Sequence, residues 1–266
     1  MDCKISFIFI FLCIAAGSSA QEGARSSALA GATVSLPMES SVAGNPACMA
    51  MFNGLSAGIN FSDHFLISEL GEQQVTATLP FHKSRFGLLI RYSGFDDYSD
   101  MTAGAAYAMK LFPKLSAGFR IDYIRIDFGE EYGSKNLLSF RIGLHYQVNN
   151  QFSSSLLLAN PYPVRLAGET YLEPSLRTGI AWNISKPLLA LLEIEKGLHH
   201  PAIVKAAMEY HLAAPFYARI GILSSPARFS FGFGLQIKTF SIDISSFYHP
   251  VLGYSPQISL IYHAKK

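Results

Sequence analysis

The chain has 266 residues, of which 50% are hydrophobic, 13% aromatic and only 15% charged. Soluble domains carry about 25% charged residues, and disordered chains are poor in apolar ones, so neither class fits this composition. The formal net charge of +2 lacks the basic excess typical of nucleic-acid binders, which excludes a nucleic-acid partner. A helical membrane protein is excluded too, since no run of 18 apolar residues follows the first segment.

Residues 1–20 have the pattern of a secretory signal peptide. Lys4 precedes an apolar stretch at 5–16, and small residues follow it up to Ala20. The alternative is a lipoprotein attached through Cys13, but positions 11 and 12 hold large residues where small ones are needed. We therefore expect the mature chain to begin at Gln21.

Only Cys48 of the three cysteines remains after residue 20, so a disulfide-stapled secreted domain is not expected. The neighbours of Cys48 carry no charge that would lower the pKa of a catalytic thiol. No nucleophile motif surrounds any serine, and the histidines lack partner ligands at metal-binding spacing. The sequence thus predicts neither an enzyme nor a cofactor.

The mature chain is dominated by segments in which apolar and polar residues alternate. In the clearest, at 228–238, apolar side chains occupy every odd position and polar or glycine residues every even position after 228. A period of two indicates β-strands. Fourteen such segments are predicted, at 54–62, 74–81, 85–95, 101–111, 115–128, 136–148, 151–159, 175–184, 187–196, 203–212, 216–223, 228–238, 239–248 and 256–263.

The links between these segments alternate in length as well. Those after even-numbered strands are very short, such as 82–84 and 149–150, whereas most of the others are longer and more polar, such as 129–135 and 160–174. Short turns at one end and longer loops at the other are typical of outer-membrane barrels, and a soluble β-sandwich has no reason to sort its loops in this way.

We therefore predict an all-β fold, a closed antiparallel up-and-down transmembrane β-barrel of about fourteen strands over residues 52–266. Such a barrel lies in the bacterial outer membrane, with apolar side chains toward the outer-membrane lipid and polar ones toward the lumen. Aromatic residues near strand ends suit an interfacial girdle: Tyr92, Tyr107, Tyr146, Trp182, Tyr217, Tyr248 and Tyr262.

The segment at 115–128 changes its alternation. Phe119, Ile121 and Tyr123 share one face, but Ile124 and Ile126 take the opposite parity. Either a β-bulge inserts a residue here, or the strand has left the bilayer.

Ionisable residues occupy many predicted inward positions. They either rigidify the lumen through salt bridges or mark a substrate path, and their mixed signs argue against a filter for ions of one sign. The predicted network comprises Arg91, Arg120, Asp122, Arg141, His145, Glu193, Glu195, Lys205, Glu209, His211, Arg219 and Asp243.

A barrel of fourteen strands encloses more space than wall side chains fill. Residues 21–51 precede the first strand and are rich in Ala, Gly and Ser, which suit a backbone threading a narrow lumen, with a turn at Asn45-Pro46. We predict that this segment plugs the lumen. The alternative is a mobile periplasmic tail.

The same region resembles the mature N-terminus of the PorV/PorQ family. Residues 28–34, which include Gly31, match one family element, and Asn45-Pro46-Ala47 match another; residues 231–262 are also similar. The resemblance implies a FadL-like barrel from Bacteroidota-type bacteria, with Gly31, Asn45, Pro46 and Ala47 as a plug motif. The chain departs from the family in being shorter and in ending on two lysines rather than an aromatic residue.

What the resemblance implies about function leaves several hypotheses open. The first, which we favour at this point, is a component of type IX protein secretion or cell-surface assembly, with secretion-machinery or cargo proteins contacting the loop at 160–174. The second is a FadL-like transporter of a small hydrophobic ligand. A general structural barrel or pore is the third.

Overall fold

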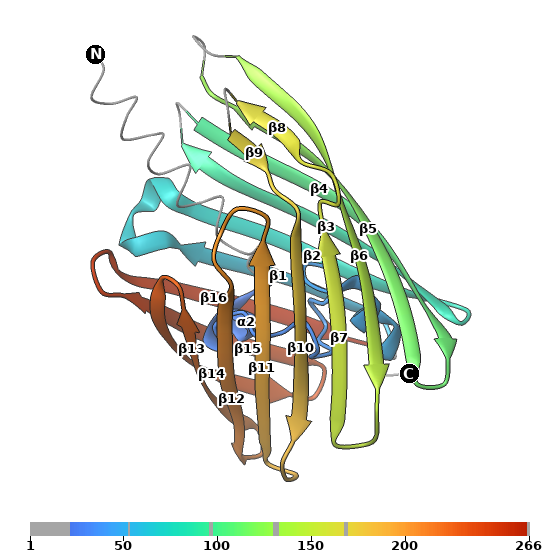
Figure 1. Cartoon of the computed structure of the whole chain (residues 1–266). Helices are drawn as coiled ribbons and strands as arrows, with labels where there is room; N and C mark the ends of the chain where they lie inside the picture. The colour runs from blue at the N-terminus through green and yellow to red at the C-terminus, as the bar shows by residue number, and fades with distance from the viewer. Residues whose placement is uncertain (1–21, 53, 96–97, 130–132, 168–169, 265–266) are drawn as a thin grey trace.

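The described residues form one closed barrel, shown in Figure 1. The computed structural model describes residues 22–264 apart from positions 53, 96–97, 130–132 and 168–169. The predicted signal peptide, 1–20, lies outside the described residues. The barrel has fourteen strands in the order β1-β16-β15-β14-β13-β12-β11-β10-β7-β6-β5-β4-β3-β2. Every neighbouring pair is antiparallel, and pairing of the first strand with the last closes the wall.

The fourteen predicted segments are confirmed as the fourteen barrel strands, and no boundary differs by more than three residues. Alternation and turn spacing therefore sufficed to locate the wall. The strands are β1 (Ser56–Asp63), β2 (Gly71–Phe81), β3 (Ser84–Phe95), β4 (Tyr98–Phe112), β5 (Leu115–Asp127), β6 (Ser134–Gln147), β7 (Phe152–Ala159), β10 (Ser175–Asn183), β11 (Leu188–Gly197), β12 (Ile203–Ala213), β13 (Phe216–Ser224), β14 (Ala227–Ile237), β15 (Phe240–His249) and β16 (Gly253–His263).

The interval at 160–174 is more than the loop that was expected. It contains a two-stranded sheet of β8 (Val164–Ala167) and β9 (Thr170–Leu172), separate from the barrel and close to β6. Strands of four and three residues are too short to show a period, which explains why the sequence did not reveal them.

The two ends of the barrel differ in their connections. One end has two-residue turns, such as 82–83 and 238–239, and the opposite end has the longer connections, such as 160–174. Short turns face the periplasm in outer-membrane barrels, so we name the two ends periplasmic and extracellular. Two 3₁₀ turns, η2 (His64–Leu66) and η3 (Ser68–Leu70), connect β1 to β2 at the extracellular end.

Alternate residues of each strand meet different surroundings. On β14, Phe229, Phe231 and Phe233 are 45%, 36% and 63% exposed on the outside, whereas Ser230 between them is 1% exposed on the inside. An apolar surface that surrounds the whole barrel cannot face water, and it suits the hydrocarbon of a bilayer. The chain is therefore an outer-membrane β-barrel.

The predicted aromatic girdle holds with one correction. Tyr107, Tyr146, Trp182 and Tyr262 are exposed on the outer face, as are Tyr92 and Tyr248 at the extracellular end. Tyr217, in contrast, shares the inward parity of Arg219 and lines an internal cavity with it. Its place near a strand end suggested the girdle, but its parity decides its side.

The change of alternation on β5 is not a bulge. Pairing with β4 and β6 is regular through Asp127, so the second explanation holds. β4, β5 and β6 are the longest strands and extend above the rest of the wall (Figure 1). In this extension Ile126 and Leu137 are buried on the inner side. The apolar residues of this extension turn inward, as a strand end that lies beyond the bilayer is expected to do.

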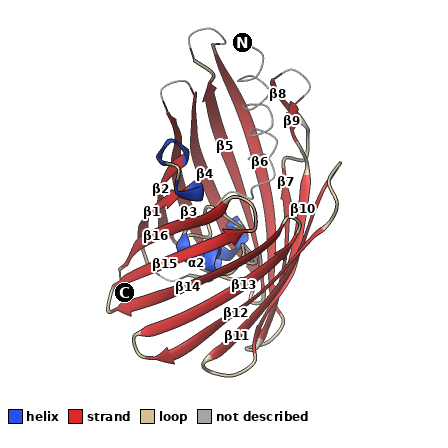
Figure 2. Cartoon of the chain, turned by 90° about the vertical axis from the view of Figure 1, so that its left-hand side faces the viewer, coloured by secondary structure: helices blue, strands red, loops and turns tan. Residues whose placement is uncertain are grey.

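The chain before the first strand lies inside the barrel. Figure 2 shows α2 (Ala24–Ala28) enclosed by the strands, and η1 (Pro46–Met51) follows it along the chain. Most side chains from Glu22 to Ala50 are buried. No helix within the described ranges is long and apolar enough to span a membrane. We call residues 22–52 the N-terminal segment.

Candidate functional site

The candidate site is the contact between the N-terminal segment and the inner wall. The resemblance residues Asn45, Pro46 and Ala47 form the start of η1. The Asn45 side chain accepts a hydrogen bond from the backbone N–H of Ala47 at 3.1 Å, and Pro46 occupies the first turn, where its missing N–H costs nothing. The Asn45 amide also donates to the carbonyl of Val34 at 2.9 Å. This motif therefore fixes the fold of the segment itself.

Two wall glycines receive this motif. Gly118 on β5 lies against the backbone of Pro46 and Ala47, and Gly143 on β6 lies against the Asn45 side chain. A Cβ atom at either glycine would overlap these atoms. The wall is thus shaped to admit η1.

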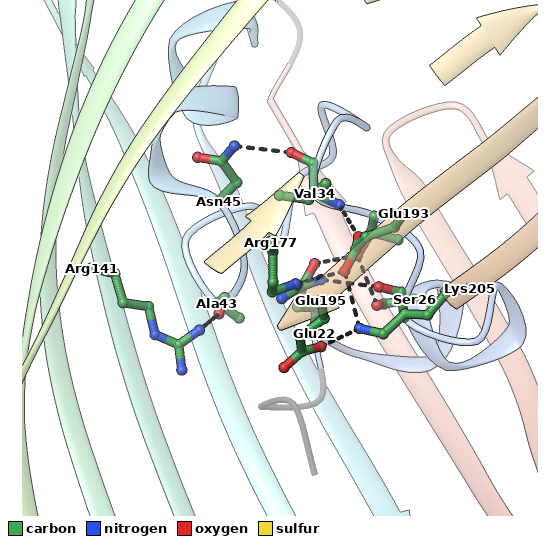
Figure 3. A network of polar contacts seen from close by, with 12 residues as sticks. Glu22, Ser26, Val34, Ala43, Asn45, Arg141, Arg177, Glu193, Glu195 and Lys205 are labelled. Carbon is green, nitrogen blue, oxygen red and sulfur yellow. Dashed lines mark hydrogen bonds and ion pairs between the residues drawn. The ribbon is translucent and has the colours of Figure 1, made fainter. Parts of the chain in front are cut away.

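The first ionic network joins the segment to β10, β11 and β12 (Figure 3). Arg177 Nε donates to Glu193 Oε1 at 2.7 Å, and its Nη1 donates to Glu22 Oε1 at 3.1 Å. Lys205 Nζ donates to Glu193 at 3.0 Å and to Glu195 at 2.6 Å. Four of the five side chains are almost fully buried. Loss of one charge would leave its partners buried and unpaired, so these charges stabilise the structure only when all of them are present.

The same network holds the backbone of the segment. Glu193 Oε2 accepts from the N–H of Val34 at 2.8 Å, and Arg177 Nη2 donates to the carbonyl of Gly31 at 3.0 Å. Gly31 has φ +70°, a left-handed conformation that glycine adopts without strain. Residues 31–34 are therefore tied directly to the wall.

A second network lies nearer the periplasmic end. Arg25 donates from Nε and Nη2 to Glu209 at 2.9 and 2.7 Å. Arg219 donates to Glu209 and to Asp243, both at 2.5 Å. Arg25, Arg219 and Asp243 of this network line a cavity of about 70 Å³, together with five further residues: Glu39, Tyr217, Leu235, Gln236 and Ser241.

A third network joins the segment to β5 and β6. Arg120 donates from Nε and Nη2 to Asp122 at 3.0 and 2.9 Å and also bonds the carbonyl of Val42. Arg141 Nη1 donates to the carbonyl of Ala43 at 3.2 Å. Each of the three networks therefore contains an arginine of the wall. That arginine donates a hydrogen bond either to the segment itself or to a carboxylate that the segment also binds.

The remaining predicted residues are not brought into these networks. His145 is buried and lies 2.8 Å from Ser155 Oγ and 3.5 Å from Cys48 Sγ. Arg91 faces Glu72 and Asp100 at the extracellular mouth, at 3.9 and 3.7 Å. His211 stacks on Tyr217 at the periplasmic end, with ring centroids 4.5 Å apart.

Burial raises the pKa of the Cys48 thiol above its usual range, so the thiolate needed for nucleophilic chemistry is disfavoured. Within the described part of the chain, no group of three His, Cys, Asp or Glu residues has the arrangement of a metal site.

Sequence reasoning did not identify the partners that the segment supplies. Glu22, Arg25 and Glu39 lie among small residues without a period that would assign them a direction. One signal in the sequence could have indicated their role: they are charged residues in a segment made mostly of small residues. A segment inside a barrel whose inner wall carries charges of both signs must supply counter-charges to that wall.

Apolar contacts complete the site. Leu29, Ala32, Leu36 and Met38 of the segment pack against Ala181, Leu189, Leu191 and Ala207 of the wall. On the opposite side, Val42, Ala43, Met49 and Ala50 pack against Leu89, Ala106 and Ala108. The segment thus covers two apolar areas of the inner wall. That the segment acts as a plug remains a prediction.

The fold is shared with transporters of hydrophobic compounds. The toluene transporter TodX of P. putida aligns with a TM-score of 0.72 at 11% identity, over 94% of this chain and 100% of that one. The monoaromatic hydrocarbon channel CymD aligns with a TM-score of 0.71 at 12% identity, over 92% and 98%. A FadL homologue from Pseudomonas aeruginosa aligns with a TM-score of 0.68 at 10% identity, over 91% and 98%. These likenesses show a FadL-like fold.

No protein-family model matches the sequence, and no curated protein matches it either.

Proposed function

We propose that this barrel carries small hydrophobic molecules across the outer membrane. The observation that supports this most directly is the apolar cluster in the extracellular extension. Ile126 and Leu137 are buried on its inner side, and Tyr98, Ile124, Phe128 and Leu172 pack against them. An inner wall that served only water-soluble solutes would be polar here, as porin interiors are. The cluster offers an apolar molecule its first contact.

Movement of the N-terminal segment would open a route beyond this mouth. The segment covers the two apolar wall areas around Leu89 and Leu191. Displacement of the segment would expose these areas to the lumen, while the polar residues between them would keep their wall partners. We therefore propose that the segment is a movable plug, and that its ion pairs set how readily it moves.

The experiment measures uptake of a neutral aromatic hydrocarbon by proteoliposomes that contain the full chain. Replacing both Ile126 and Leu137 with Asn removes apolar contact area from the mouth. We expect the initial uptake rate to fall at least tenfold, since one aliphatic side chain contributes about 1.5–3 kcal/mol and about 1.4 kcal/mol already corresponds to tenfold.

The matched control replaces Arg125 and Asp127 with Gln and Asn. These residues lie on the outer face of the same strand end and pair with each other at 3.8 Å. We expect uptake to be unchanged in this control. Equal uptake by the two double variants would contradict a hydrophobic path through the mouth.

The secretion function implied by the PorV/PorQ resemblance stays a prediction. The Asn45-Pro46-Ala47 motif that carries the resemblance caps η1 and packs on wall glycines, a structural role that a transporter needs equally. Recovery of large protein partners from detergent-solubilised membranes would support secretion, whereas bound hydrophobic compounds would support transport.

A further inference from the structure

The periplasmic end of the barrel carries exposed lysines on four different hairpins. These lysines lie in the turns themselves. We call this set the lysine rim. It comprises Lys83 between β2 and β3, Lys114 between β4 and β5, Lys186 between β10 and β11, and Lys238 between β14 and β15.

The rim has one sign of charge. Within the described ranges none of its lysines forms an ion pair; the ion pairs of lysine there belong to the interior residue Lys205. Glu39, near this end, is occupied by Arg25 at 3.9 Å and His263 at 3.5 Å. Lys114 donates to the carbonyl of Val148 at 3.0 Å, which uses one of its three N–H groups.

The extracellular end differs. There cations and carboxylates lie side by side, as in the pair Arg125–Asp127 at 3.8 Å and the pair His200–Glu173 at 3.8 Å. A generally soluble surface would mix charges at both ends, so the single sign at the periplasmic end calls for an anionic partner.

Aromatic side chains fix the depth of the rim in the membrane. Exposed rings lie on the outer face directly before or after the turns: Phe81, Phe112, Trp182, Phe216 and Phe240. Such rings mark the boundary between hydrocarbon and head groups. The lysines lie beyond this boundary, and their flexible stems let the ammonium groups reach the level of the lipid phosphates.

The arrangement of the rim selects the kind of partner. Two of its hairpins, β2–β3 and β4–β5, are neighbours in the barrel order, and the other two, β10–β11 and β14–β15, lie in separate parts of the wall. A folded acidic protein would contact a continuous patch, whereas a lipid leaflet contacts the whole circumference. We propose that the lysine rim binds the phosphate groups of anionic phospholipids in the periplasmic leaflet, which gives the barrel an anionic lipid annulus on that side.

The only tryptophan of the chain reports on this site. Trp182 is 40% exposed at the end of β10, next to the turn that contains Lys186. In vesicles of phosphatidylcholine, bromine-labelled phosphatidylglycerol and bromine-labelled phosphatidylcholine are compared as quenchers of its fluorescence. At low ionic strength we expect the anionic lipid to bind about fivefold more strongly, the factor that one lysine near an anionic surface provides. In about 1 M salt the ratio should approach one.

Variants test whether the preference for the anionic lipid depends on Lys186 rather than on other parts of the surface. Lys186→Gln should bring the ratio close to one, and Lys186→Arg should keep it. Lys196→Gln, near the extracellular end of the following strand β11, should leave it unchanged. A second probe, Trp182→Phe with Phe112→Trp, should respond to Lys114→Gln in the same way.

Equal quenching by the two lipids in the unaltered protein would overturn the proposal, as would a preference that survives Lys186→Gln. If the partner of the rim is an acidic protein rather than a lipid, the two lipids should quench the purified barrel equally.

Discussion

At the residue scale, the direction of wall side chains could be predicted but their partners could not. Parity assigned Arg120, Glu193 and Arg219 to the interior because strand alternation needs only local sequence. Which carboxylate each arginine meets depends on how the N-terminal segment folds inside the wall. Glu22 and Arg25 come from that segment, which has no period, so their roles emerged only from the structure.

Arg177 provides the sharpest test at this scale. It bonds two buried carboxylates, Glu22 and Glu193. Arg177→Met leaves both without their shared partner, and we expect the free energy of unfolding in detergent to fall by about 3–5 kcal/mol. The control is Arg125→Met, which removes an exposed ion pair with Asp127 and should change stability by less than about 1 kcal/mol. Similar losses in both variants would mean that the buried network contributes nothing beyond a surface pair.

At the scale of elements, the strands could be predicted because two independent signals agreed, alternation within segments and link lengths between them. The sheet of β8 and β9 could not, since strands of four and three residues are too short for an alternation to stand out. The path of the N-terminal segment could not be predicted either. Its turns at α2 and η1 are set by contacts with Gly118, Gly143 and other wall residues distant in sequence.

A disulfide lock tests whether the N-terminal segment must move. The Cys48 thiol interacts with Ser155 of β7, and both contact His145. In Ser155→Cys, oxidation should join the segment to the wall, and we expect hydrocarbon uptake to drop at least tenfold and to return on reduction. The control is the same oxidation of the unaltered protein, in which Cys48 is a free cysteine and the only one among the described residues. Undiminished uptake by the oxidised variant, with the disulfide verified by mass spectrometry, would exclude movement of this part of the segment as a step in transport.

At the scale of the whole molecule, composition and alternation together indicated that the apolar residues face lipid. The exposed phenylalanines of β14 and the buried serine between them agree with this. The interior could be predicted only in outline. A lumen of this size can hold the N-terminal segment in many conformations, and the sequence does not indicate which of them is adopted.

The membrane environment predicts a dependence on depth. Phe233 lies in the middle of β14 and is 63% exposed on the outer face, whereas Phe240 lies at the periplasmic edge. Phe233→Arg should lower the stability of the folded barrel in lipid by about 2–4 kcal/mol and Phe240→Arg by about 0–1 kcal/mol. Reversible unfolding in phospholipid vesicles measures both. Equal costs would indicate that β14 does not cross the hydrocarbon.

The order of the chain has a consequence for biogenesis. The residues that occupy the interior are translated ahead of every strand, and β16, which pairs with β1 to complete the circle, is translated last. If the barrel closed first, the N-terminal segment would have to enter the closed lumen afterwards and pass three networks of buried charges. Assembly in which the wall wraps around an occupant that is already in place avoids that obstacle, so the N-terminal segment would serve as the template on which the later hairpins come together.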